Sequence, residues 1–160
     1  MILRHRMRAT LAGVAFAALG TLAAAEPISA VPCIDTWIAR SDNIAEPWAD
    51  HTAVFANGDV RVALLDTIEP AGSPFHLLIL SPPFDLTGGR SCQVVSRGSG
   101  FGWTRLDFAT LTAAYDPATG LTFAITGAEL AEVSDDPITV SLTLDQQTGE
   151  ITGETGVAAE

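Results

Sequence analysis

The sequence predicts a mainly β protein: an antiparallel β-sandwich or small barrel of about six to eight strands, with one short helix and one disulfide. The first observation is that apolar and polar residues alternate in short segments bounded by turn residues, as over residues 51–66. The second is that clear helical spacing is confined to about residues 107–115. The third is a single pair of cysteines, Cys33 and Cys92.

Residues 52–56 and 59–66 predict a β-hairpin, because both segments alternate and Asn57-Gly58 lies between them. A two-residue turn of this type needs positive φ at both positions, which Asn and Gly tolerate best. The turn would place Ala56 opposite Asp59. His51 would then end an apolar row on one face, where a hydrogen-bonded histidine at the edge of a sheet is the ordinary outcome.

Further strands are predicted where apolar runs are bounded by Gly, Pro, Asp and Asn. They are expected at 75–81, at 92–96, at 121–126 and as a hairpin over 138–154 with its turn from Asp145 to Gly149. Residues 127–137 fit either a helical turn or a loop. The last five residues, GVAAE, are expected to be a frayed tail.

One short helix is predicted over about 107–115. Phe108, Leu111 and Tyr115 fall at positions i, i+3 and i+7, and Asp107 precedes them as a possible N-cap. A turn sequence that begins at Asp116 would end this helix.

The first 25 residues have the layout of a cleavable signal peptide. Three arginines are followed by an apolar run rich in alanine that ends at Ala25, the expected cleavage site. The run over 9–25 is shorter than the roughly 20 apolar residues that span a bilayer, so no stable membrane insertion is expected after cleavage. We therefore expect a periplasmic or secreted protein with a single domain over 26–160.

Charge argues against nucleic acid as a partner. The whole chain has a formal charge of −11 and no lysine. Removing the signal peptide leaves five arginines against 19 acidic residues, a formal charge of −14. Nucleic-acid affinity depends on Lys and Arg displacing counterions, so an acidic chain of this kind repels phosphate backbones.

Cys33 and Cys92 predict a structural disulfide, because two cysteines in an exported chain normally pair. A redox pair would usually be spaced C-x-x-C, and these two residues are far apart. We expect the bond to tie the N-terminal segment to the middle of a sheet.

Several classes of chemistry lack the residues that they need. Without lysine there is no phosphate-binding loop ending in G-K-[ST] and no Schiff-base lysine. The nearest approach to a serine-hydrolase G-x-S-x-G motif surrounds Ser91, but Gln93 replaces the last glycine. No cofactor is predicted, and the balance favours a protein that is not an enzyme.

Two candidate sites remain. Loop aromatics at Trp48, Phe101 and Trp103 could bind a protein or a small ligand, although burial under loops is the alternative explanation. The second site is a metal or acid–base centre at His51, His76 and Asp66, which requires both imidazoles on one face of the sheet. If Leu64 faces Leu77, the two histidines lie on opposite faces.

Three classes of function therefore stay open. The first hypothesis is a non-enzymatic exported β domain that binds a ligand or partner through its loop aromatics. The alternative is a small exported enzyme or metal-binding protein that uses the two histidines. A third is a structural or stress-related protein without a discrete site.

Overall fold

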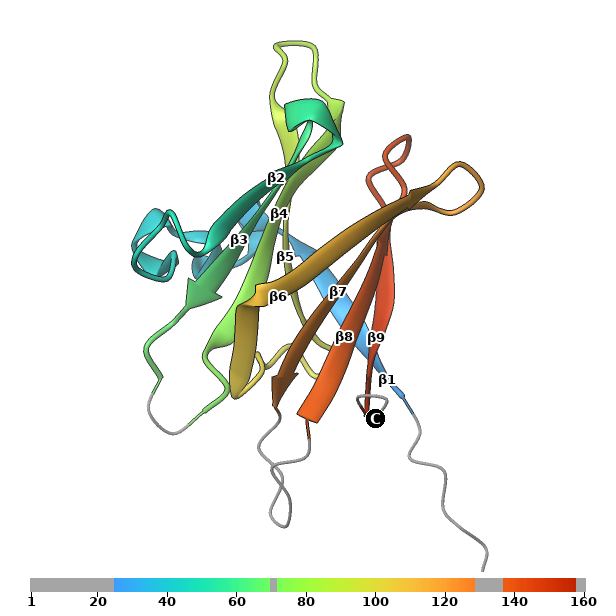
Figure 1. The fold of residues 1–160 in the computed structure, drawn as a ribbon. Helices are drawn as coiled ribbons and strands as arrows, with labels where there is room; N and C mark the ends of the chain where they lie inside the picture. Colours follow the sequence, from blue (N-terminus) through green and yellow to red (C-terminus); the bar gives the residue numbers. More distant parts are fainter. Residues whose placement is uncertain (1–24, 70–71, 129–136, 158–160) are drawn as a thin grey trace, which may run out of the picture.

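Nine antiparallel strands form one sheet in the computed structural model, which describes residues 25–69, 72–128 and 137–157 (Figure 1). In chain order they are β1 (Glu26–Pro32), β2 (Thr52–Phe55), β3 (Val60–Asp66), β4 (Phe75–Phe84), β5 (Arg90–Arg97), β6 (Arg105–Asp116), β7 (Gly120–Ala128), β8 (Pro137–Leu144) and β9 (Ile151–Val157). Their order across the sheet is β2-β3-β4-β5-β1-β9-β8-β7-β6. The predicted antiparallel β class is confirmed, with slightly more strands than expected.

The sheet folds back on itself and is nearly closed. The two ends of the sheet approach each other through aromatic rings: the rings of His51, just before β2, and Phe108 of β6 lie 6.3 Å apart, edge to face. The rings of Phe55 and Phe123 lie 5.1 Å apart in a similar arrangement. Such ring pairs stabilise a structure by about 0.5–1.5 kcal/mol beyond the area that they bury.

The hydrophobic core fills the space between the two halves of the sheet. It is built from alternate residues of the strands, as period-two alternation requires. Its largest fully buried side chains in the described chain are Trp103, Leu77, Ile79, Ile125, Leu142, Leu144, Val60, Val62, Val95 and Val140. Full burial of a large apolar side chain contributes about 1.5–3 kcal/mol.

The predicted hairpin is confirmed in register and in turn type. Phe55 lies opposite Val60 and Thr52 lies opposite Ala63. Asp59 donates its backbone N–H to the carbonyl oxygen of Ala56 over 3.1 Å, closing a turn whose central residues have φ of 56° and 104°. This turn carries the short 3-10 element η4 (Ala56–Gly58).

The predicted helix over 107–115 is wrong, because these residues belong to β6. Between the pairs Asp107–Thr126 and Thr112–Ala124, β6 advances five residues while β7 advances two. Ala109 donates its N–H to Asp107 Oδ1, which is the bond expected of an N-cap, but Thr126 N–H then bonds Thr110 Oγ1 and the chain resumes the strand. The bulge therefore produces helix-like spacing without a helix.

β1 was not expected from the sequence, since Pro27 and Pro32 interrupt its pattern. It nevertheless occupies the centre of the sheet. Residues from Ile28 onward pair with β5, whereas Glu26 and Pro27 pair with β9. Proline lacks an N–H donor and is tolerated near the ends of a strand, where one partner takes over from the other.

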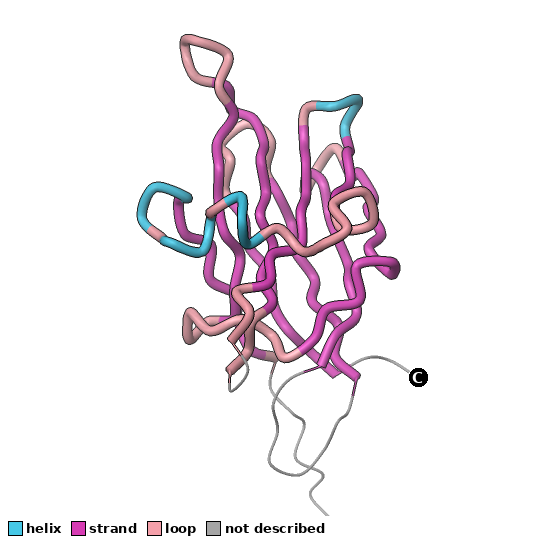
Figure 2. The backbone as a smooth tube through the Cα atoms, turned by 90° about the vertical axis from the view of Figure 1, so that its left-hand side faces the viewer, coloured by secondary structure: helices cyan, strands magenta, loops and turns pink. Residues whose placement is uncertain are grey.

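Three short 3-10 turns follow β1 and run along the outside of the strands (Figure 2). They are η1 (Cys33–Asp35), η2 (Trp37–Ala39) and η3 (Ser41–Asn43). The predicted disulfide between Cys33 and Cys92 is present and anchors this segment to β5, which is the fourth strand in the order across the sheet. The disulfide is consistent with an oxidising, non-cytoplasmic environment.

Some predictions fall on residues outside the described ranges. These are the signal peptide up to residue 24, most of the ambiguous segment over 127–137, and the last three residues of the tail. Gly156 and Val157, which were expected to fray, belong to β9. Within the described ranges, no helix is long and apolar enough to cross a membrane.

Candidate functional site

His76 lies on the outer face of the sheet, away from the hydrophobic core. Leu64 pairs with Leu77 and Leu65 pairs with His76, so the imidazole shares its face with Leu65. Leu77 pairs in turn with Val95, which places Ser96 of β5 beside His76 on the same outer face. His76 Nδ1 and Ser96 Oγ are 2.7 Å apart.

Both partners of this hydrogen bond are buried, although they face away from the core. His76 is 4 % exposed and Ser96 is 5 % exposed. Burial disfavours the charged imidazolium and lowers the pKa of His76 from 6.5 to about 4. The side chain is therefore neutral at pH 7.

Three loop segments enclose a cleft above the imidazole, which we call the His76 cleft. The segments are the 3-10 turns after β1, the loop between β3 and β4, and the loop between β5 and β6. Its volume is about 230 Å³, and it is lined by Trp37, Ile38, Thr67, Glu69, Ser73, His76, Gly100, Phe101 and Gly102. The site therefore combines two aromatic residues, one buried imidazole and one carboxylate.

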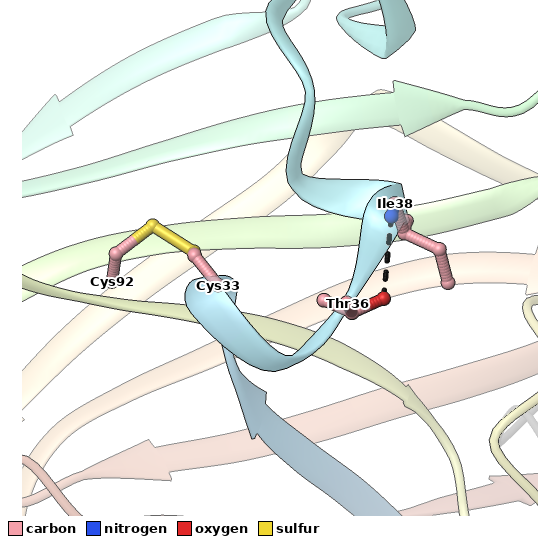
Figure 3. Close-up of a disulfide and its surroundings, with 4 residues drawn as sticks. All are labelled: Cys33, Thr36, Ile38 and Cys92. Atoms are coloured by element: carbon pink, nitrogen blue, oxygen red, sulfur yellow. Dashed lines mark hydrogen bonds between the residues drawn. A yellow bond between two sulfur atoms is a disulfide. The ribbon is translucent and has the colours of Figure 1, made fainter.

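The wall that carries Trp37 is fastened at several points. The disulfide holds Cys33 against Cys92 with their Cα atoms 5.4 Å apart, and Figure 3 shows this bond at the start of the turn segment. Thr36 Oγ1 accepts a hydrogen bond from the N–H of Ile38 over 3.2 Å (Figure 3). Asn43 Nδ2 also donates to the carbonyl oxygen of Ile38. Trp37 thus projects from a wall with fixed backbone geometry.

The opposite wall comes from the loop between β5 and β6. Arg97 donates its backbone N–H to the carbonyl oxygen of Phe101 over 2.9 Å, and Gly100 donates to the carbonyl oxygen of Arg97 over 2.8 Å. Gly102 then passes close to β4. A Cβ atom on Gly102 would overlap the carbonyl oxygens of Ser73 and Phe75 and would lie 2.9 Å from His76 Nε2. Only glycine lets the loop approach the imidazole this closely.

The structure separates the three aromatics proposed from the sequence. Phe101 is 68 % exposed and lines the His76 cleft. Trp48 is 49 % exposed but lies in the segment before β2 and does not line this cleft. Trp103 has no exposed surface, and its Nε1 donates to Thr155 Oγ1 over 3.2 Å, so it is a core residue rather than part of an exposed patch.

Trp37, which sequence reasoning did not select, is the aromatic that faces the cleft with Phe101. It is 59 % exposed. The signal that could have found it is its position four residues after Cys33, because a disulfide close by fixes the backbone of a loop tryptophan.

The second predicted site does not form. The pairing of Leu64 with Leu77 is the register that puts His51 and His76 on opposite faces. His51 packs edge-on against Phe108 with its Nδ1 3.1 Å from the carbonyl oxygen of Pro47, and Asp66 Oδ1 accepts a bond from the N–H of Ile68. The described residues contain no group of three or more His, Cys, Asp or Glu that could hold a metal ion.

A second groove lies on the outer face of the same half of the sheet. It has a volume of about 260 Å³ and is lined by apolar side chains such as Val54, Leu78 and Leu80, with Thr52 and Arg61 among them. Specific small-molecule sites combine apolar walls with a few convergent polar groups. We take the His76 cleft as the candidate site because it alone of the two joins exposed aromatic side chains, Trp37 and Phe101, to a buried polar group, the imidazole of His76.

Comparisons of the chain with protein-family models, with curated proteins and with solved structures return no match.

Proposed function

We propose that this chain is an exported binding module that is not an enzyme, and that the His76 cleft holds a small ligand. The observation that carries the proposal is the placement of exposed Trp37 and Phe101 around a buried, neutral imidazole. Exposed aromatic side chains on anchored loops bury much area at little entropic cost when a ligand binds.

The low pKa of His76 supports binding rather than acid–base catalysis. A general base works best when its pKa is near the operating pH. With a pKa of about 4, His76 would be a weak proton acceptor at neutral pH. It can nevertheless form a hydrogen bond to a ligand.

Export through a signal peptide over residues 1–25 is part of the same proposal, and the mature protein would be periplasmic or secreted. The basic and apolar parts of that segment support it, as does the disulfide between Cys33 and Cys92. N-terminal sequencing of the protein recovered from its native host should begin at Glu26. A mature chain that retains the first 25 residues would contradict export by cleavage.

Ligand-observed NMR with a library of small aromatic fragments tests the binding function. We expect hits whose signals are lost with Trp37→Ala and with Phe101→Ala. Trp48→Ala is the matched control, because Trp48 is exposed to a similar degree but lies outside the cleft. Hits that persist in both cleft variants would place binding elsewhere.

A protein partner is the second candidate. The exposure of Trp37 and Phe101, at 59 % and 68 %, also suits an interface anchored by aromatic side chains. A fragment screen without hits would favour this candidate over a small ligand.

A further inference from the structure

The hydrogen bond between His76 and Ser96 determines which ring nitrogen carries the proton. A neutral imidazole has one N–H donor and one acceptor nitrogen, and a serine hydroxyl can donate or accept. Either Ser96 donates to Nδ1, which places the proton on Nε2, or Nδ1 donates to Ser96. The two arrangements leave different groups without a partner.

The second arrangement would leave the hydroxyl hydrogen of Ser96 unsatisfied. Ser96 is 5 % exposed, and His76 is the single hydrogen-bond partner of its side chain in the described structure. An unsatisfied buried donor costs about 1–3 kcal/mol. The arrangement in which Ser96 donates leaves the Nε2–H donor of His76 unpaired instead, but Nε2 is not among the fully buried unpaired polar atoms of the described residues, which are Ser81 Oγ and Thr104 Oγ1. Because an acceptor can reach Nε2–H and none can reach a free Ser96 hydroxyl hydrogen, Nδ1 is the acceptor and Nε2 carries the proton.

The Nε2–H group then lies at the floor of the His76 cleft. Within the described chain Nε2 has no hydrogen-bond partner, and it lies beside Gly102, which also lines the cleft. An otherwise buried residue, 4 % exposed, thus presents one unpaired donor to the cleft. Such a donor needs an acceptor from water or from a ligand.

Charge narrows the class of ligand further. Among the described residues that line the cleft, Glu69 alone carries a charge. The mature chain would also have a strongly negative net charge, with five arginines against 19 acidic residues. An anionic ligand would meet repulsion without a countercharge, whereas an uncharged ligand would not.

We infer that the His76 cleft selects small, planar ligands without negative charge whose carbonyl oxygen or ring nitrogen accepts a hydrogen bond from Nε2–H of His76. The inference rests on the proposed binding function and specifies its ligand class. Trp37 and Phe101 contact the faces or edges of the ring system, and the single donor at the floor fixes its orientation.

Three probes of matched planar shape test this class on the full mature chain. Acetophenone carries a neutral carbonyl acceptor, α-methylstyrene replaces the oxygen by a carbon, and benzoate carries a negative charge. Titration at pH 7, followed by NMR, should give an affinity for acetophenone at least about tenfold higher than for the other two, which corresponds to about 1.4 kcal/mol.

The tautomer is measured separately from the ¹⁵N chemical shifts of His76 in the unliganded wild-type protein, which needs no substitution. A protonated Nε2 and an unprotonated Nδ1 are expected, and the reverse would overturn the inference. α-Methylstyrene or benzoate binding as tightly as acetophenone would overturn the acceptor preference but leave the proposed cleft intact. If none of the three probes binds, but other fragments bind the wild type and no longer bind Trp37→Ala, the ligand class alone is wrong. If no fragment binds at all, both proposals fail.

Discussion

Ser96 Oγ lies 2.7 Å from Nδ1 of His76, and this bond joins two buried polar side chains on the outer face of adjacent strands. The outer face of a sheet in a protein of this size is usually solvated, and a polar pair there would ordinarily meet water. Here the anchored 3-10 segment and the loop between β5 and β6 cover it instead. The pair therefore affects both the stability of the fold and the chemistry of the cleft.

The free energy of unfolding should decrease as the pH falls, because His76 is held neutral in the folded protein. Its pKa is about 4 in the folded state and 6.5 in the unfolded state, so between these values the unfolded chain binds more protons. The stabilising contribution is fully present above pH 6.5 and is lost as the pH falls toward 4. The full loss amounts to roughly 3 kcal/mol.

Urea denaturation between pH 8 and pH 4.5 measures this dependence. In a plot of the free energy of unfolding against pH, His76→Gln should remove most of the slope between pH 6.5 and 4.5, whatever its effect on absolute stability. His51→Gln removes the other described histidine and controls for the loss of an imidazole elsewhere in the fold. Equal slopes for the wild type and His76→Gln would show that His76 titrates normally.

Ser96→Ala should destabilise the fold by about 1–3 kcal/mol, because it leaves Nδ1 of His76 buried without a partner. Ser91→Ala on the same strand is the control: its hydroxyl makes one long contact, 3.5 Å to the carbonyl oxygen of Pro83. We expect the control to change stability by less than about 0.5 kcal/mol. The free energy of unfolding in urea distinguishes the two, and similar small effects would mean that the Ser96 bond contributes little.

The strand register could be predicted where the turn residues determined it. Asn57-Gly58 specifies a two-residue turn, and that turn alone sets every pair from Phe55–Val60 to Thr52–Ala63. No such signal marks β1, whose pairing with two different strands depends on contacts distant in the sequence. At β6 a local bulge after Asp107 imitates the spacing of a helix, so a purely local pattern gave the wrong element.

The candidate site was harder to predict than the fold, because the three cleft walls are brought together by tertiary structure. Phe101 was selected as a loop aromatic, but its partners Trp37 and His76 come from other segments. The face of His76 depends on the length of the loop between β3 and β4, and apolar residues on both faces of β4 leave that parity undetermined. Trp103 resembles Phe101 in sequence context, yet its pairing with Phe75 draws it into the core.

Gly102→Ala should be strongly destabilising, because the new Cβ would overlap the backbone oxygens of Ser73 and Phe75, which cannot move as a flexible side chain can. The loss should be about 1–3 kcal/mol or more. Gly156→Ala in β9 is the matched control, since a Cβ there would meet no atom within 4 Å. Thermal unfolding of both variants measures the difference, and equal melting temperatures would contradict the close approach of this loop to β4.

Reduction of the disulfide between Cys33 and Cys92 should lower the free energy of unfolding by about 2–5 kcal/mol, because the bond closes a long loop in the unfolded chain. It should also weaken ligand binding, since the wall that carries Trp37 loses its covalent anchor. Urea denaturation and probe titration with and without reductant measure both effects. The double variant Cys33→Ala/Cys92→Ala controls for the reductant and should not respond to it. Unchanged affinity after reduction would show that the wall holds its position without the bond.

The three tryptophans should differ in their fluorescence according to their burial. Trp103 has no exposed surface and donates to Thr155, so it should emit at shorter wavelength and resist quenching by acrylamide, whereas Trp37 and Trp48 should be quenched readily. Trp103→Phe should also destabilise the fold by about 1–3 kcal/mol, because it leaves a cavity and an unpaired Thr155 hydroxyl. Trp48→Phe is the control and should leave stability unchanged within about 0.5 kcal/mol. If Trp103→Phe removes the most readily quenched component instead, Trp103 is exposed in solution and returns to the set of candidate binding residues.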